Sequence, residues 1–195
     1  MTAAAYKAQN ELGFEGDSFL KEAFKEMIRF NGIRTIIETG SYLGSTTKQL
    51  SSMVEKVYTI EINREYFEIT RAKCAEENVF PYFGNSSELL PGMLEFAKDK
   101  GPIICWLDAH WGPYNPLLDE LKAIKESELK PCIIVHDFKV PDHPELGFDS
   151  YAGQDYEWSW IEESINNIYG KDGYKYYYNS QAEGAKRGVI FIEPK

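Results

Sequence analysis

The sequence predicts an α/β fold built on a doubly wound, mostly parallel sheet of seven strands. Between residues 34 and 137, short apolar runs alternate with segments of helical periodicity, the pattern of parallel strands joined by right-handed helical crossovers. The last two apolar runs, 174–178 and 188–192, are too close for a helical crossover, so we expect a C-terminal antiparallel hairpin. At 195 residues the chain is expected to form a single domain, 1–195.

The expected elements follow in order along the chain. A first helix is expected over 17–30, because apolar side chains recur there at helical spacing behind Asp17 or Ser18 as the N-cap. Strands are then expected at 34–38, 56–60, 79–83, 103–107 and 132–135. The intervening helices are expected to begin at Ser45 or Thr46, at Asn63, just after the turn 84–87, at Pro116 and at Glu157.

Composition excludes several classes of protein. The formal net charge of −10 repels phosphate backbones and no basic patch is present, so nucleic acid is not an expected partner. No apolar run approaches a membrane span and the N-terminus lacks the apolar core of a signal peptide, so we expect a soluble cytoplasmic protein without a membrane partner. Three widely separated cysteines fit neither a disulfide framework nor a zinc site.

Residues 38–46, Glu-Thr-Gly-Ser-Tyr-Leu-Gly-Ser-Thr, carry most of the functional information. They predict a strand that ends in an acid, a turn with glycines at 40 and 44, and the start of a helix. Such a turn places a small ligand against backbone N–H groups beside a carboxylate. The Gly-x-x-x-Gly spacing differs from the G-x-G-x-x-G of dinucleotide binders, and the wider turn suits a nucleoside that carries a sulfonium group.

Polar residues follow every expected parallel strand at its carboxyl end. Because these ends meet at one edge of the sheet, the side chains are expected to share a ligand crevice. Glu61, about twenty residues after the turn, is expected to accept both hydroxyls of a ribose, the alternative being an exposed glutamate. Asn85, Ser86 and Ser87 are expected either to bind an adenine edge or to cap the next helix.

Two residues of the glycine turn are given less direct roles. Glu38 is expected to hold the turn and to meet the amino group of the ligand, directly or through water. Tyr42 is expected either to pack over the ligand or to fill space within the turn.

Asp108, His110, His136 and Asp137 are the candidates for chemistry. Asp108 and Asp137 end neighbouring strands, so their carboxylates can converge. One interpretation is a site for Mg²⁺ or Ca²⁺, or for Mn²⁺ if His110 or His136 joins, that lowers the pKa of a substrate hydroxyl. A second is a metal-free network in which an aspartate orients a histidine as general base. The third is a structural network with His136 half-buried and satisfied.

The pattern Glu38-x-Gly40-x-Tyr42-x-Gly44 resembles the first motif of class I S-adenosylmethionine (SAM)-dependent O-methyltransferases, especially the catechol and caffeoyl-CoA type. The segment 107–111, Leu-Asp-Ala-His-Trp, followed by Val-His-Asp at 135–137, resembles a bacterial branch with relatives of macrocin O-methyltransferase and the cephalosporin hydroxylases. That branch also carries an aspartate in the next helix, here Asp119. The resemblance covers residues 33–138 and implies a Rossmann-like fold, a SAM cofactor and O-methylation.

The resemblance also implies roles for individual residues. Those that would contact or frame SAM are Glu38, Gly40, Ser41, Gly44, Glu61, Ser86 and Asp108. Asp108 and Asp137 would be metal ligands where the family uses a metal. The catechol type has a lysine base after the aspartate of the fourth strand, where this chain has His110-Trp111-Gly112-Pro113, and Asp-Asn after the fifth, where this chain has Asp137-Phe138. His110 is therefore the preferred base, with Asp108 and Asp137 beside it.

Two segments are expected to close the site. Residues 1–32 are expected to form an N-terminal helical cap, and the aperiodic segment 138–156 is expected to form a lid. Aromatic residues in and after this segment are expected to cover the acceptor or, alternatively, to form a homodimer interface: Phe148, Tyr151, Tyr156, Trp158 and Trp160.

The sequence therefore predicts a SAM-dependent methyltransferase that acts on the hydroxyl of a small-molecule acceptor, with metal assistance as an open alternative. One rival hypothesis is a nicotinamide-dependent oxidoreductase, against which the missing G-x-G-x-x-G counts. The other is a catalytically silent nucleoside-binding or assembly module of the same fold.

Overall fold

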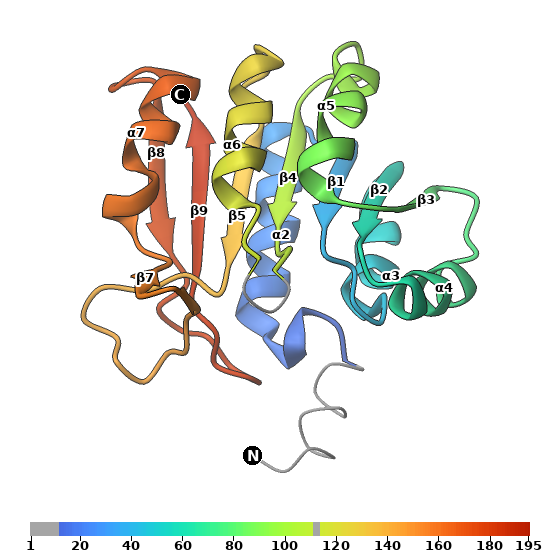
Figure 1. The fold of residues 1–195 in the computed structure, drawn as a ribbon, viewed down its shortest axis with the longest axis horizontal. Helices are drawn as coiled ribbons and strands as arrows, with labels where there is room; N and C mark the ends of the chain where they lie inside the picture. The colour runs from blue at the N-terminus through green and yellow to red at the C-terminus, as the bar shows by residue number, and fades with distance from the viewer. Residues whose placement is uncertain (1–11, 111–113) are drawn as a thin grey trace.

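Seven strands form one sheet in the computed structural model, which describes residues 12–110 and 114–195 (Figure 1). Their order is β3-β2-β1-β4-β5-β9-β8. Their bounds are β1 Thr35–Thr39, β2 Lys56–Glu61, β3 Val79–Phe83, β4 Ile103–Leu107, β5 Cys132–His136, β8 Tyr174–Tyr178 and β9 Val189–Pro194. Strands β1 to β5 are parallel, and β9 runs antiparallel between β5 and β8. The predicted doubly wound sheet and its C-terminal hairpin are confirmed.

Helices cover both faces of this sheet. One face packs against α5 (Ser86–Ala97), α6 (Leu117–Glu126) and α7 (Trp158–Tyr169) (Figure 1). The other packs against α2 (Ser18–Asn31) and α3 (Ser45–Ser51), and α4 (Arg64–Lys73) packs against α3. Ile36 and Ile37 of β1 point to opposite faces and are both fully buried, each in a different core. Burial on both faces explains why the strands read as continuous apolar runs.

The helix α2 forms for the reasons that the sequence indicates. The carboxylate of Asp17 accepts two backbone N–H bonds of the first turn, as predicted for an N-cap. The helix buries Leu20, Phe24 and Met27 on one side, and each such side chain contributes about 1.5–3 kcal/mol. It ends at Gly32, whose left-handed conformation (φ 63°) suits a residue without a side chain.

The start of α3 differs from the prediction. The helix begins at Ser45, but its N-cap is Gly44 in a left-handed conformation (φ 71°), with no capping bond from a side chain. The two hydroxyls expected to cap it have other partners. Ser45 accepts a hydrogen bond from Lys73 Nζ at 2.9 Å, and Thr46 accepts one from the backbone N–H of Phe14 at 2.9 Å. Tertiary contacts with α4 and the N-terminal segment thus redirect both side chains.

The segment 138–156 is more ordered than its sequence indicates. It contains a small antiparallel hairpin of β6 (Ser150–Tyr151) and β7 (Gln154–Asp155). The turn between these strands is Ala152-Gly153, and both residues have positive φ (52° and 83°). This conformation is usually encoded by Asn-Gly or Asp-Gly, so Ala152-Gly153 is a weak signal for a hairpin.

The described part of the N-terminal cap consists of the short helix η1 (Phe14–Gly16) and α2. Residues 1–11 of the expected cap, and Trp111–Pro113 of the segment after β4, lie outside the described residues. Within the described part of the chain, no helix combines the length and apolar character needed to cross a membrane.

Candidate active site

A cavity of about 680 Å³ opens at the carboxyl edge of the parallel strands. Its volume lies in the range of small-molecule and cofactor sites. The predicted residues among those that line it are Gly40, Ser41, Tyr42, Glu61, Asn85, Ser86, Asp108, His110 and Asp137. The glycine turn, the acid after β2 and the polar groups after β3, β4 and β5 therefore share one space, as the sequence predicts.

The turn after β1 requires its two glycines for steric reasons. Gly40 has φ 80°, and a Cβ atom there would lie 2.5 Å from the carbonyl oxygen of Asp108. Gly44 has φ 71°, and a Cβ atom there would lie 3.0–3.1 Å from atoms of Thr70. The turn thus packs directly on the end of β4 and on α4, which fixes the position of its backbone at the cavity wall.

Glu61 ties this turn to the end of β2. Its Oε2 accepts the backbone N–H of Tyr42 at 2.8 Å, and its Oε1 accepts that of Asn63 at 2.8 Å. Burial raises the pKa of Glu61, while these two hydrogen bonds lower it. The backbone N–H of Ile62 and the hydroxyl of Ser41 also contribute to lowering this pKa. A carboxylate fixed by these groups therefore lines the cavity.

Glu38 lies behind the cavity wall instead of in it. Its Oε2 accepts hydrogen bonds from the hydroxyls of Thr47 and Thr59, both at 2.5 Å, and it is 1% exposed. Burial raises the pKa of Glu38 to about 7. These contacts give Glu38 the turn-holding role, whereas its expected approach to the amino group of a ligand stays a prediction.

Asn85 is the N-cap of α5: its Oδ1 accepts a hydrogen bond from the backbone N–H of Ser87 at 3.2 Å. Its side chain also contacts the hydroxyl of Tyr114, with Nδ2 at 3.0 Å and Oδ1 at 3.1 Å. Tyr114 lines the cavity together with Asn85 and Ser86. The capping role of this polar turn is confirmed, and adenine binding stays a prediction.

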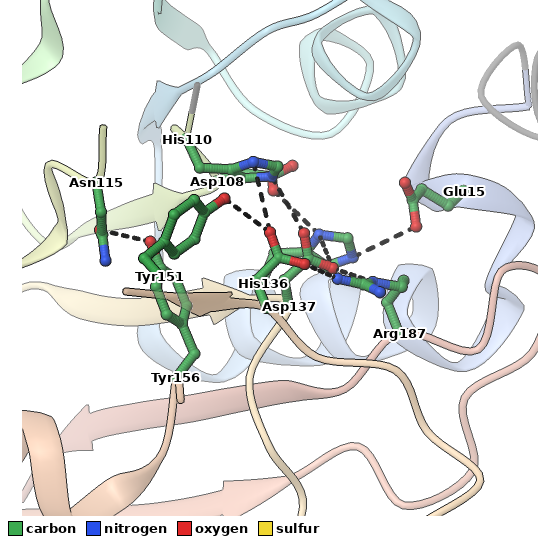
Figure 2. Close-up of polar contacts among 10 residues, drawn as sticks. Glu15, Asp108, His110, Asn115, His136, Asp137, Tyr151, Tyr156 and Arg187 are labelled. Carbon is green, nitrogen blue, oxygen red and sulfur yellow. Dashed lines mark hydrogen bonds and ion pairs between the residues drawn. The ribbon is translucent and has the colours of Figure 1, made fainter. Parts of the chain in front are cut away.

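Two histidine–aspartate pairs follow β4 and β5 (Figure 2). His110 Nε2 lies 3.2 Å from Asp137 Oδ2, and His136 Nδ1 lies 3.0 Å from Asp108 Oδ1. The two pairs are crossed, because each joins a residue after β4 to a residue at or after β5. Asp137 has a positive φ of 56°, a conformation that costs a non-glycine residue free energy and often accompanies functional sites.

The charges of this group follow from its geometry. Burial by itself would raise the pKa of Asp137, but the charge of His136 and the hydrogen bond from His110 hold it well below its usual value. Burial would lower the pKa of His136, but Asp137 and Asp108 raise it well above its usual value. The pKa of His110 is also raised, because its hydrogen bond to Asp137 and the nearby carboxylates outweigh burial. These shifts favour the ionised carboxylate of Asp137 and the protonated ring of His136.

Sequence reasoning missed three charged residues that complete this group. Arg187 donates from Nε to Asp137 Oδ1 and from Nη2 to Asp149 Oδ1, and Asp149 Oδ2 lies 3.5 Å from His110 Nδ1. Glu15 of η1 places Oε2 3.8 Å from His136 Nε2 (Figure 2). The position of Arg187 in the sequence was a signal. It lies just before β9, and because β9 runs antiparallel to β5, β9 begins at the edge of the sheet where β5 ends.

Among the described residues, only some of the predicted metal ligands belong to one candidate ion site. Asp108, His110 and Asp137 offer ligand atoms within 4.8 Å of one another, but His136 is not part of this group. The Nδ1 of His136 is already paired with Asp108 Oδ1 at 3.0 Å. Asp137 accepts from Arg187 through Oδ1, and its Oδ2 faces His110. An ion bound at this group would lie beside the guanidinium of Arg187, whose positive charge opposes it, so the donor set does not fit a divalent ion while Arg187 contacts Asp137.

A buried acid next to this group is Glu120, in the first turn of α6. The resemblance drew attention to Asp119, but Asp119 is exposed, whereas Glu120 is 1% exposed and its Oε1 has no hydrogen-bond partner among the described residues. Helical geometry explains the difference, since adjacent residues point about 100° apart. Burial raises the pKa of Glu120 to about 7.

Replacing Glu120 by glutamine is expected to stabilise the protein above pH 7. A carboxyl group whose folded pKa is raised contributes stability below its unfolded pKa, near 4.5, and loses it as pH rises through about 7. For Glu120 the loss amounts to about 3 kcal/mol. Urea unfolding of wild type at pH 5 and pH 8 should show this loss together with that of Glu38, and E120Q should show a smaller one. The exposed control D119N should behave as wild type does.

The segment 138–156 reaches the cavity through Asp149, not through an aromatic ring. Among the described residues that line the cavity, none is one of the five predicted rings. Tyr151 comes nearest, with its ring centroid 6.1 Å from that of His110. Tyr156 is buried in the core, and Trp158 stacks on Tyr176 at 4.0 Å. Closure over an acceptor and a homodimer interface both stay predictions.

The fold was compared with known proteins. No family model and no curated protein sequence matches the chain. Among solved structures, TomG, an O-methyltransferase from Streptomyces achromogenes involved in tomaymycin synthesis and solved with SAM, is 18% identical, with a TM-score of 0.63 over 100% of this chain and 91% of that chain. An O-methyltransferase from Bacillus cereus in complex with SAH is 16% identical, with a TM-score of 0.62 over 100% and 92%. The chain has the fold of these methyltransferases.

The same fold also supports other reactions. A precorrin 8w decarboxylase from Methanobacterium thermoautotrophicum is 16% identical, with a TM-score of 0.54 over 89% of this chain and 90% of that chain. The methyltransferase-like fold thus confirms the predicted Rossmann-like architecture. The fold by itself does not determine the reaction, which depends on the residues of the cavity.

Proposed function

We propose that this protein is a SAM-dependent methyltransferase that methylates a hydroxyl group of a small molecule. The observation that carries the proposal is one cavity with two chemically distinct ends. At one end lie the glycine turn and the fixed carboxylate of Glu61, and at the other lie His110 and Asp137. Structural neighbours solved with SAM or SAH support the choice of cofactor.

The first end suits the nucleoside of SAM. Glu61 lines the cavity after β2 and is placed to accept the ribose hydroxyls, while Gly40 and Ser41 let the backbone approach the methionine part closely. Asn85 and Ser86 line the cavity after β3 and are placed to contact the adenine. Asp108 lies between the two ends and frames the sulfonium with its negative charge.

The second end suits deprotonation of the acceptor. Asp137 holds the Nε2–H of His110, which leaves Nδ1 to take the hydroxyl proton. The acceptor oxygen then attacks the methyl carbon, the carbon–sulfur bond breaks, and its electron pair returns to sulfur. The products are the methyl ether and SAH, and the imidazolium formed on His110 lies between the carboxylates of Asp137 and Asp149. Every step uses side chains of this protein.

Calorimetry with SAM, SAH and NAD tests the cofactor. SAM and SAH are expected to bind at micromolar concentrations and NAD is not, because the turn lacks the G-x-G-x-x-G spacing. Binding of NAD without SAM would instead support an oxidoreductase. SAH formation is then measured with a panel of phenols, sugars and hydroxylated natural products. SAM binding without turnover on any of them would favour the non-catalytic module.

A further inference from the structure

Arg187 occupies a place in the site that no motif indicated. It lies just before β9, and because β9 is antiparallel to β5, with Val189 opposite His136, Arg187 comes to lie beside Asp137. The backbone around it is held from two sides. Phe138 donates to the carbonyl of Gly188 at 2.8 Å, and Gly147 donates to the carbonyl of Lys186 at 2.8 Å. The position of Arg187 is therefore set by main-chain hydrogen bonds.

The side chain has a space made for it. A Cβ atom on Gly147 would lie 2.8 Å from Nη1 of Arg187, so any other residue at 147 would have to displace the guanidinium from this position. The guanidinium lines the cavity, and the side chain is 27% exposed. It is the closest cationic partner of both Asp137 and Asp149 among the described residues.

The contacts of Arg187 form a closed ring with the proposed base. Asp137 and Asp149 each accept a hydrogen bond from Arg187 through Oδ1. The Oδ2 of Asp137 lies 3.2 Å from His110 Nε2 (Figure 2). The Oδ2 of Asp149 accepts the hydroxyl of Tyr151 at 2.9 Å and lies 3.5 Å from His110 Nδ1. One planar cation thus fixes two carboxylates: Asp137 holds the Nε2 edge of the imidazole, and Asp149 lies near the Nδ1 edge, where its charge stabilises the imidazolium once Nδ1 has taken a proton.

We propose that Arg187 is a positioning residue that takes the place of a divalent metal: it bridges Asp137 and Asp149, aims both at His110, and blocks cation binding at Asp108, His110 and Asp137. This inference rests on the proposed function for its catalytic part only. Its metal-binding part concerns the protein without SAM or acceptor. A fixed positive charge a few ångströms from these carboxylates opposes a second cation, and its removal should free Asp137 to bind one.

The test measures Mn²⁺ binding by electron paramagnetic resonance and calorimetry. Wild type is expected to bind Mn²⁺ only at millimolar concentrations or above, and R187M is expected to bind one equivalent at least about tenfold more tightly. Adding D137N to R187M should remove the new site. K186M, which removes the exposed neighbouring charge, should behave as wild type does. Tight binding of one Mn²⁺ by wild type would overturn the proposal, whether or not R187M folds.

Activity gives a second readout if SAM turnover is found. Wild-type turnover should be the same in EDTA as in Mg²⁺. R187M should lose kcat with unchanged SAM affinity, R187K should restore part of it, and Mn²⁺ should stimulate R187M but not wild type. Loss of wild-type turnover in EDTA, with recovery in Mg²⁺, would overturn the proposal. If the protein does not bind SAM, the proposed function fails, and the Mn²⁺ measurement still decides the role of Arg187.

Discussion

Replacing His110 by glutamine is expected to lower kcat by about 10²–10⁴-fold without changing SAM affinity. The imidazole is the group at the acceptor end of the cavity that can take a proton, and Asp137 fixes its orientation through Nε2. Glutamine keeps a similar size and a hydrogen-bond donor toward Asp137 but cannot accept the hydroxyl proton. The measurement is single-turnover SAH formation, with SAM affinity from calorimetry.

The pH profile separates this role from a structural one. In the proposed mechanism the neutral imidazole is the base, so kcat/KM should rise with pH through the raised pKa of His110, above the usual 6.5. The groups that set this pKa are Asp108, Asp137 and Asp149. H110Q should lack this rise. H143Q is the matched control, because His143 pairs with Glu145 at 2.8 Å and does not line the cavity. Full activity of H110Q would place the base elsewhere.

Replacing Glu61 by alanine is expected to weaken SAM binding by about 100-fold or more. Two hydrogen bonds from ribose hydroxyls to a carboxylate are lost, each contributing about 1.5–3 kcal/mol. The variant also releases the backbone N–H groups of Tyr42 and Asn63, which loosens the glycine turn. Titration calorimetry with SAM and SAH gives the affinity directly.

The control for Glu61 is another glutamate next to the same strand. Glu55 directly precedes β2 at its amino end, where its exposed side chain pairs with Arg34 at 3.5 Å. E55A should bind SAM as wild type does. If E61A kept wild-type affinity while its thermal unfolding was unchanged, the ribose assignment would be wrong.

Much of the fold and the cofactor end of the site could be predicted from the sequence, because they depend on local patterns. Burial on both faces requires continuous apolar runs in β1 to β5, and the left-handed turn after β1 requires glycine at 40 and 44. The parallel topology then brings strand ends to one edge, so residues as distant in sequence as Glu61 and Asp137 are expected together. The predicted N-cap of α3, Ser45 or Thr46, was wrong because both hydroxyls form hydrogen bonds with distant segments instead.

The sequence by itself determined the doubly wound sheet, its hairpin and the residues at the carboxyl edge. Only the tertiary structure decided which histidine faces which aspartate, that Glu120 and not Asp119 is buried, and that Arg187 and Asp149 complete the site. The physical reason is the origin of the contacts. Apolar periodicity and turn chemistry act over a few residues. The ion pair of Arg187 with Asp137 instead joins residues 50 positions apart and depends on the pairing of β9 with β5, which no local pattern indicates.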